Sequence, residues 1–429
     1  MESYPLESVP TLFGVDEKLT VKINPSLEGL DVTEKMLRET TTYELRKLLS
    51  LEFCWLPAEV VEAYNGAKTE EAHKQVLIEK VYGNCKLNCK GCFAKQDDLF
   101  KGHDLVHPDK IMDLIEESVR ELGTKTVKYL GPTEFFRDKD VFKYLDRFEK
   151  MGIILGVFAK DPMFGNDAEV EALFSDQGIH TAEELIVKLA SYQCLRIIFN
   201  FRSFDDQITN DLVRGGYVGK EDYAGDYKKV QNRALQLLYK YFAQAEFAKG
   251  KEARLVILNA PITPETISEA KEIFQYFTDR GLLVVSTTSM QSGCGGKIYQ
   301  ELNSGFMEKF AQYYATAIKY SVKRGLITHE YVEQYGPSPY AGTRHCIQMC
   351  SGLIVRETGQ LMRCPGADHK EWQDGVTPEE LMEHGIVWAW PKTKNYAQEL
   401  CANPGCLAKP AIFTSAFNDR VMDLYKEMV

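Results

Sequence analysis

Three cysteines lie close together near residue 90, in a pattern that could bind metal. Cys85, Cys89 and Cys92 belong to the stretch GNCKLNCKGCF and have the spacing C-x3-C-x2-C. Thiolates are soft ligands that suit zinc or an iron–sulfur cluster, and both normally take four ligands. Three thiolates on a four-iron cluster leave one iron open for a substrate or cofactor. A zinc site would instead need a ligand from elsewhere, for example His103 or His107.

A regular series of apolar segments and amphipathic segments surrounds these cysteines. Strands are predicted over 75–83, 124–131, 153–160, 194–200, 253–261 and 282–289, and helices over 107–122, 140–151, 182–191, 224–248, 263–280 and 303–324. Continuous apolar strands that alternate with helices predict a parallel sheet, and six such units predict an α/β fold with a partial (β/α)6 TIM-like barrel. Active sites of barrels lie on the loops that leave the carboxyl ends of the strands. The cysteine stretch follows the first strand and is therefore expected on that face.

The cysteine motif, on a loop after the first strand of such a series, resembles the signature of the radical SAM superfamily. This resemblance implies a [4Fe–4S] cluster held by Cys85, Cys89 and Cys92, whose open iron binds the amino and carboxylate groups of S-adenosylmethionine. One electron from the cluster would cleave this cofactor to methionine and a 5′-deoxyadenosyl radical, which abstracts a hydrogen atom from the substrate. It also implies an electron donor such as flavodoxin or ferredoxin.

Two further segments differ in part from the pattern of the superfamily. Many members carry an aromatic residue just before the third cysteine, where it packs on adenine. Gly91 occupies that position, so Phe93 is the candidate for this role, with simple loop packing as the alternative. Members often have Gly-Gly-Glu-Pro after the second strand, and here LGPTEF supplies Gly131, Thr133 and Glu134 as candidate contacts to the methionine amine. The alternative is a plain turn with a solvated carboxylate.

Polar residues at the ends of later strands are further candidates for binding the cofactor. Asn200, Ser203, Arg254 and Asn259 could bind ribose hydroxyls and the methionine carboxylate, or could serve only as turn formers and caps. After the sixth strand, STTSMQSGCGGK places Cys294 at the expected mouth of the site. Some radical SAM epimerases use a cysteine to return a hydrogen atom, which would make Cys294 catalytic. The alternative is an incidental thiol in a flexible turn.

The tail contains a second group of cysteines, and the segment LIVRETGQLMRC within it is typical of a β-hairpin. This tail resembles the Twitch/SPASM extension of radical SAM enzymes, which implies one auxiliary [4Fe–4S] cluster. Its ligands would be four of the five tail cysteines, Cys346, Cys350, Cys364, Cys401 and Cys406, with Cys346 as the expected spare. A zinc ribbon is the structural alternative.

Composition and charge limit the location and partners of the 429-residue chain. The net charge of −11 argues against broad binding to nucleic acid or to an anionic membrane. The start MESYPLESVP lacks the apolar core of a signal peptide, so a cytoplasmic location is expected. The predicted division is an N-terminal extension over 1–75, the radical SAM barrel over 76–330, the auxiliary-cluster domain over 335–410 and a C-terminal helix over 411–429.

An auxiliary cluster in this family accepts an electron from a substrate radical or anchors the substrate, and both roles favour oxidation or bond formation. The principal prediction is a small-molecule substrate, such as a sugar, an aminocyclitol or a nucleoside. The alternative is peptide maturation by C–C or C–S crosslinking or by epimerisation. Peptide-modifying members often carry an N-terminal winged-helix module, and residues 1–75 are short for one. A different class of function is a non-catalytic iron–sulfur or zinc scaffold, or an electron-transfer protein.

Overall fold

The computed structural model describes residues 75–79, 85–93, 106–130, 135–216, 221–325, 327–336, 352–362, 375–393 and 414–429. Its strands are β1 (Gln75–Glu79), β2 (Thr126–Leu130), β3 (Ile154–Ala159), β4 (Leu195–Asn200), β5 (Leu255–Ile262), β6 (Leu283–Thr288), β7 (Gly352–Arg356) and β8 (Leu361–Met362). Its longer helices are α6 (Pro108–Leu122), α7 (Val141–Met151), α8 (Asp167–Phe174), α9 (Ala182–Ala190), α11 (Tyr227–Tyr239), α13 (Ala270–Thr278), α15 (Ser304–Lys323), α18 (Pro378–Ala389) and α20 (Ser415–Met428). Shorter helices are α10 (Asp206–Asp211), α12 (Ala245–Phe247), α14 (Gly295–Gln300) and α16 (His329–Tyr335).

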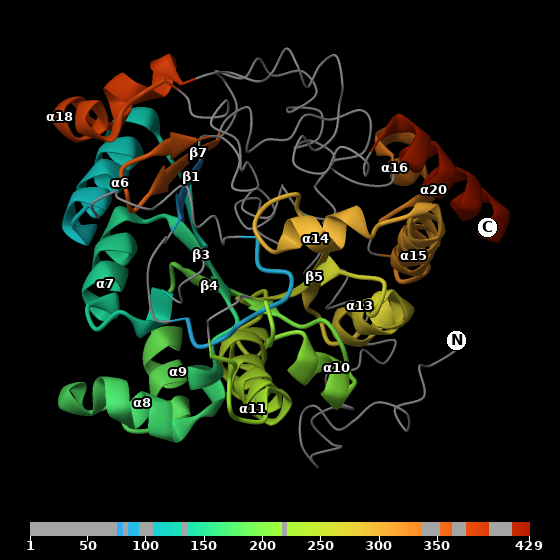
Figure 1. The fold of residues 1–429 in the computed structure, drawn as a ribbon, viewed down its shortest axis with the longest axis horizontal. Coiled ribbons are helices and arrows are strands. Elements are labelled where there is room, and N and C mark those ends of the chain that lie inside the picture. The colour runs from blue at the N-terminus through green and yellow to red at the C-terminus, as the bar shows by residue number, and fades with distance from the viewer. Residues whose placement is uncertain are drawn as a thin grey trace.

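The strands form one sheet in the order β6-β5-β4-β3-β2-β1-β7-β8. The first six strands pair in parallel with their neighbours in chain order, and helices surround them (Figure 1). A parallel sheet in which each strand is followed by an outer helix is the barrel arrangement, and here it stays open between β6 and β8. The predicted partial (β/α)6 barrel is therefore confirmed.

Local sequence explains where the helices of the barrel begin and end. Helix α6 starts with Pro108 at its first turn and ends at Gly123, which has the left-handed conformation that glycine adopts without a steric penalty. Helix α7 ends in the same way at Gly152. Both helices bury one apolar face, for example Ile111 and Ile115 of α6, in the main core. These two helices match their predicted bounds to within a residue.

Three segments differ from the prediction. The helix expected from Thr263 begins later, because Thr263 N–H donates to Thr266 Oγ1 in a turn at 3.0 Å and α13 follows only after a 3₁₀ turn. The single helix expected over 224–248 contains a π-helical segment, Lys240–Gln244, between α11 and α12. Residues 161–181, between the strand predicted over 153–160 and the helix predicted over 182–191, include helix α8.

The tail contributes strands to the same sheet as the barrel. The predicted hairpin is confirmed, because β7 and β8 pair antiparallel through Ile354–Met362 and Val355–Leu361. Strand β7 also pairs in parallel with β1 along its whole length. Helix α18 is anchored to α6, where the carboxylate of Glu117 accepts a hydrogen bond from the Ile386 N–H at 3.0 Å. The predicted division into domains stays a prediction.

Among the described residues, no helix has both the length and the apolar character needed to cross a membrane.

Candidate functional site

The cysteine loop, residues 85–93, follows β1 and crosses the middle of the ring of helices in Figure 1. A segment that we call the strap, residues 212–216, binds its backbone from one side. Asn88 N–H donates to the Val213 carbonyl at 2.9 Å, and Gly216 N–H donates to the Asn88 carbonyl at 2.9 Å. Because these bonds join main chain to main chain, the strap fixes the path of the loop between its first and last cysteines.

The strap approaches the loop so closely that only glycine fits at its end. A Cβ atom on Gly216 would lie 2.1 Å from the Cys89 carbonyl oxygen. The loop after β6 contacts both the cysteine loop and the strap. Cys294 N–H donates to the Cys92 carbonyl at 2.9 Å, and the Cys294 thiol donates to the Gly216 carbonyl at 3.0 Å. The structure therefore places Cys294 directly beside the cysteine loop.

All three motif cysteines are half-buried, and a half-buried cation touches one of them. The Lys160 ammonium donates to Cys89 Sγ at 3.5 Å. Desolvation, and to a smaller extent the nearby Arg202 guanidinium, lowers the pKa of Lys160 to about 8. The Cys89 and Cys85 thiolates act in the opposite direction and raise this pKa. The second cation, Arg202, is 4 % exposed, and burial lowers its pKa against the attraction of Cys89 and Cys92. Two cations beside clustered thiols suit a negatively charged cluster.

An ion-pair network fixes the end of β3 on which Lys160 lies. The next residue, Asp161, is almost fully buried and accepts hydrogen bonds from Arg137 at 2.5 Å and from the Met163 N–H at 2.9 Å. Arg137 also pairs with Glu169. A buried carboxylate held by a guanidinium and a backbone amide has little freedom to move. The direction in which Lys160 leaves the strand is therefore set by its neighbours.

Three predicted cofactor contacts lie at the carboxyl ends of β4 and β5. Asn259 is 0 % exposed, and neither amide atom of its side chain meets a hydrogen-bond partner in the part of the chain that the structure describes. Asn200 donates to the Ala260 carbonyl at 2.5 Å, while its Oδ1 also lacks a partner there. Ser203 instead donates to Glu269 at 2.6 Å. Buried amides with unused donors and acceptors fit a polar ligand that completes their bonds.

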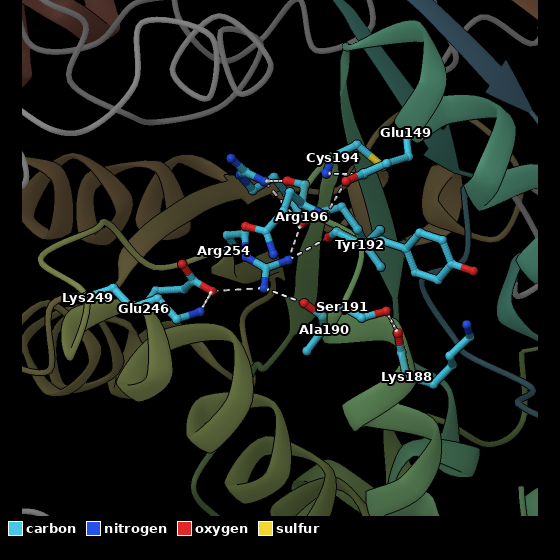
Figure 2. Close-up of polar contacts among 12 residues, drawn as sticks. Glu149, Lys188, Ala190, Ser191, Tyr192, Cys194, Arg196, Glu246, Lys249 and Arg254 are labelled. Atoms are coloured by element: carbon cyan, nitrogen blue, oxygen red, sulfur yellow. Dashed lines mark hydrogen bonds and ion pairs between the residues drawn. The ribbon is translucent and has the colours of Figure 1, made fainter.

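The fourth predicted contact, Arg254, lies at the other end of the sheet. It precedes β5, and its guanidinium donates to the carbonyls of Ala190 and Tyr192, each at 2.7 Å, and to Glu246 at 2.9 Å (Figure 2). The same figure shows Glu149 accepting from the Cys194 N–H nearby. This position does not support a cofactor contact, because amino and carboxyl ends of parallel strands form opposite faces of a barrel. Arg254 is a structural residue of the amino face.

The structure explains why glycine precedes the third cysteine. A Cβ on Gly91 would lie 2.9 Å from Ile298 Cδ1 and 3.1 Å from Pro261 Cγ, so an aromatic side chain has no room there. Phe93 is half-buried and packs against the main core. Its predicted contact to adenine stays a prediction.

Several predicted site residues lie outside the described residues. These are Gly131, Thr133 and Glu134 after β2, and the tail cysteines Cys346, Cys350, Cys364, Cys401 and Cys406. Their proposed roles rest on the sequence alone.

Two site residues that the sequence analysis missed are Lys160 and Arg202. Both carried the signal that was used for Asn200, namely a polar residue within two positions of the end of an apolar strand. Within the described part of the chain, no three His, Cys, Asp or Glu side chains are arranged to hold a single metal ion. A four-iron cluster makes a different demand, because each thiolate binds its own iron and the sulfurs do not converge on one point. The three thiols on one loop, the two cations and the unpaired amides fit such a cluster with a polar ligand.

No family model and no curated protein matches the sequence. Solved structures with a similar fold include SuiB of Streptococcus suis bound to its precursor peptide SuiA, with a TM-score of 0.49 and 13% identity over 74% of this chain and 64% of that chain. SuiB bound to S-adenosylmethionine has a TM-score of 0.46 and 13% identity over 76% and 68% of the two chains. Native anSMEcpe with bound AdoMet and Cp18Cys peptide has a TM-score of 0.45 and 14% identity over 83% and 96%. The chain thus spans slightly less than two thirds of peptide-bound SuiB, and identities this low concern the fold alone.

Proposed function

We propose that this chain is a radical SAM enzyme in which Cys85, Cys89 and Cys92 hold a [4Fe–4S] cluster that binds S-adenosylmethionine. The observation that carries the proposal is the place of the three-cysteine loop. It leaves β1 at the face of the barrel where the unpaired amide of Asn259 and the cation of Lys160 also lie. When bound, the cluster supplies the electron that cleaves the cofactor to methionine and a 5′-deoxyadenosyl radical.

The residues of the chain have distinct tasks in this proposal. The strap and the loop after β6 hold the cysteine loop by backbone hydrogen bonds. Lys160 and Arg202 offset the negative charge of the cluster. Asn259 offers both amide atoms of its side chain, and Asn200 its Oδ1, to the polar parts of S-adenosylmethionine, since these atoms have no partner among the described residues. Each task uses a group that is already positioned before the cofactor binds, which lowers the cost of binding.

We further propose that the tail holds one auxiliary [4Fe–4S] cluster through four of its five cysteines. This rests on the cysteine spacing and on the confirmed hairpin between Cys350 and Cys364. A second cluster would accept an electron from the substrate or anchor it. The reducing electron for the first cluster would come from a flavodoxin or a ferredoxin.

The substrate is either a peptide or a small molecule. Among the similar structures, SuiB holds a precursor peptide and anSMEcpe holds a Cp18Cys peptide, which agrees with peptide maturation better than with the small-molecule class. Their low similarity does not assign a substrate to this chain. Cys294, half-buried beside the cysteine loop, would be the hydrogen-atom donor if the reaction is an epimerisation.

The radical SAM proposal is tested by metal analysis and cofactor cleavage under anaerobic conditions. We expect about eight irons per reconstituted chain and formation of 5′-deoxyadenosine with dithionite. The triple variant Cys85→Ala, Cys89→Ala, Cys92→Ala should keep about four irons and form no nucleoside. Zinc in place of iron, or a fully loaded protein that leaves S-adenosylmethionine intact, would favour the scaffold alternative.

The substrate class is tested with the same protein. Peptides encoded near the gene and a panel of sugars, aminocyclitols and nucleosides would be compared by the increase in 5′-deoxyadenosine that each causes. Incorporation of solvent deuterium into the product, lost in Cys294→Ala with the rate of cofactor cleavage retained, would identify epimerisation. Product formation by Cys294→Ala at the rate of the unmodified chain would remove Cys294 from the mechanism.

A further inference from the structure

Lys160 differs from ordinary lysines because its half-buried ammonium lies against a cysteine sulfur. Its Nζ is 3.5 Å from Cys89 Sγ. The Lys160 ammonium also lies 5.8 Å from the centre of the Tyr227 ring, on whose face a cation is attracted. Tyr227 belongs to a small apolar cluster with Leu87 and Val213, against which Cys85 and Cys89 pack. The contact between ammonium and sulfur is therefore shielded on one side by apolar side chains.

The backbone of Lys160 is fixed as well as its side chain. The Tyr227 hydroxyl donates to the Lys160 carbonyl at 3.1 Å. On the next residue, the buried carboxylate of Asp161 is held by Arg137 and by the backbone at Met163. These contacts fix the point and the direction from which the Lys160 side chain leaves the backbone. Lys160 is thus preorganised to meet the sulfur of Cys89.

We propose that Lys160 is a positioning residue that raises the reduction potential of the cluster through a charge-assisted hydrogen bond to Cys89. The inference rests on the proposed function, since it requires a cluster on the cysteine loop. Reduction adds one electron from the flavodoxin or ferredoxin and makes no covalent bond. Net charge, hydrogen bonds to sulfur and solvent exposure set the potentials of such clusters. A nearby cation stabilises the more negative, reduced state.

The geometry favours this role over direct binding of S-adenosylmethionine. The hydrogen bond of Lys160 goes to Cys89, which is itself a proposed iron ligand. Arg202, the second cation, is buried; it donates to the Leu212 carbonyl of the strap at 3.2 Å and lies near Gly91. Lys160 therefore approaches the cysteine loop from the end of β3 and lies beside the sulfur of Cys89. Arg202 approaches it from the end of β4 and lies near Gly91.

The test compares Lys160→Met with Lys160→Arg and with the control Lys228→Met. Lys228 is more deeply buried than Lys160, at 1 % exposed, and its ammonium donates to the Ser203 carbonyl at 2.8 Å. The reduction potential of the first cluster is measured by anaerobic titration followed by electron paramagnetic resonance, in tail-cysteine variants if the two signals overlap. Affinity for S-adenosylmethionine is measured on the same samples by equilibrium binding.

We expect Lys160→Met to shift the ratio of reduced to oxidised cluster about tenfold toward the oxidised form, or about 59 mV for a one-electron couple. Lys160→Arg should lie close to the unmodified chain, and Lys228→Met should not shift the potential. If Lys160→Met fails to retain iron, the same tenfold shift is expected in Lys160→Gln, which lacks the charge but keeps a hydrogen-bond donor.

Other outcomes would overturn the inference. An unchanged potential in Lys160→Met would do so, and so would iron loss in both Lys160 variants, which would mean a steric role. Weaker binding of S-adenosylmethionine at an unchanged potential would make Lys160 a cofactor ligand instead. A chain that binds no iron in its unmodified form would refute the proposed function itself, and that result is distinct from all of these.

Discussion

Substitution of Gly216 by alanine tests whether the strap holds the cysteine loop in place. The new Cβ would lie 2.1 Å from the Cys89 carbonyl oxygen, 2.5 Å from its carbon and 3.0 Å from the Asn88 oxygen. All three atoms belong to the backbone, so no side-chain rotation can relieve the contact. The strap must therefore move away from the loop.

The size of this movement sets the expected cost. An ordinary contact begins at 3.4 Å, so the strap must withdraw by about 1.3 Å from the 2.1 Å position. The 2.9 Å hydrogen bond from Gly216 N–H to the Asn88 carbonyl would then be lost. A lost hydrogen bond costs about 0.5–1.5 kcal/mol and overpacking about 1–3 kcal/mol. We expect the free energy of unfolding to fall by about 2–4 kcal/mol.

Gly165→Ala is a matched control for this variant. Its Cβ would lie 2.1 Å from the Val230 carbonyl oxygen, again a backbone atom, but on helix α11 instead of the cysteine loop. Neither glycine has a left-handed conformation, so backbone strain does not separate the two variants. Urea denaturation should show a similar loss of stability in both. Only Gly216→Ala should release iron faster to a chelator.

Two results would refute this reasoning. One is a Gly216→Ala chain whose stability and rate of iron release match those of the unmodified chain, which would mean that the strap does not press on the loop. The other is equal acceleration of iron release in Gly165→Ala. General loss of stability, and no specific effect of the strap, would then explain the iron release.

Three other changes give separate tests. Arg254→Met should lower the free energy of unfolding by about 3–5 kcal/mol, because it removes the donor to the Ala190 and Tyr192 carbonyls and the buried partner of Glu246, leaving the more exposed Lys249, while iron content per folded chain stays unchanged. Asn259→Leu should raise the melting temperature and weaken S-adenosylmethionine binding, since the buried amide lacks partners among the described residues; a lower melting temperature would contradict this. Burial raises the pKa of Glu149, but hydrogen bonds from Cys194 and Gln193 outweigh it, so the pKa is lowered overall. The ionised carboxylate of Glu149 therefore stabilises the folded chain above the unfolded pKa, and this stabilisation is lost as pH falls through the folded pKa. Glu149→Gln should therefore flatten the acid side of the stability–pH curve, and an unchanged slope would exclude the effect.

The sequence was sufficient to predict the barrel because its strands and helices have a strong periodic signal. Continuous apolar runs such as that of β4 predict strands buried on both faces, by the outer helices and by the barrel interior, and glycines such as Gly123 mark where helices end. The cysteine motif could be recognised in the sequence as a candidate cluster-binding loop, because this recognition depends only on the local spacing of the three cysteines. Hairpin β7–β8 was predictable from its turn residues for the same reason.

Features that depend on distant segments could not be predicted in this way. The strap binds the cysteine loop from more than a hundred residues further along the chain, as in the bond from Asn88 to Val213, and no periodic pattern marks such a contact. Arg254 was misplaced because a polar residue before a strand looks like one after it when only adjacency is considered. Lys160 needed the distance to Cys89, which only the fold supplies.

The pairing of β7 with β1 has a consequence for synthesis of the chain on the ribosome. Gln75 pairs with Gly352 and Glu79 with Arg356, so one edge of the first strand has to wait until most of the chain has been made. Contacts this far apart slow folding, and an open strand edge can pair with another chain in the meantime. The segment that carries the three cysteines follows β1, and β1 gains its second neighbouring strand only after β7 has been made. We therefore expect insertion of the cluster to follow release of the tail from the ribosome.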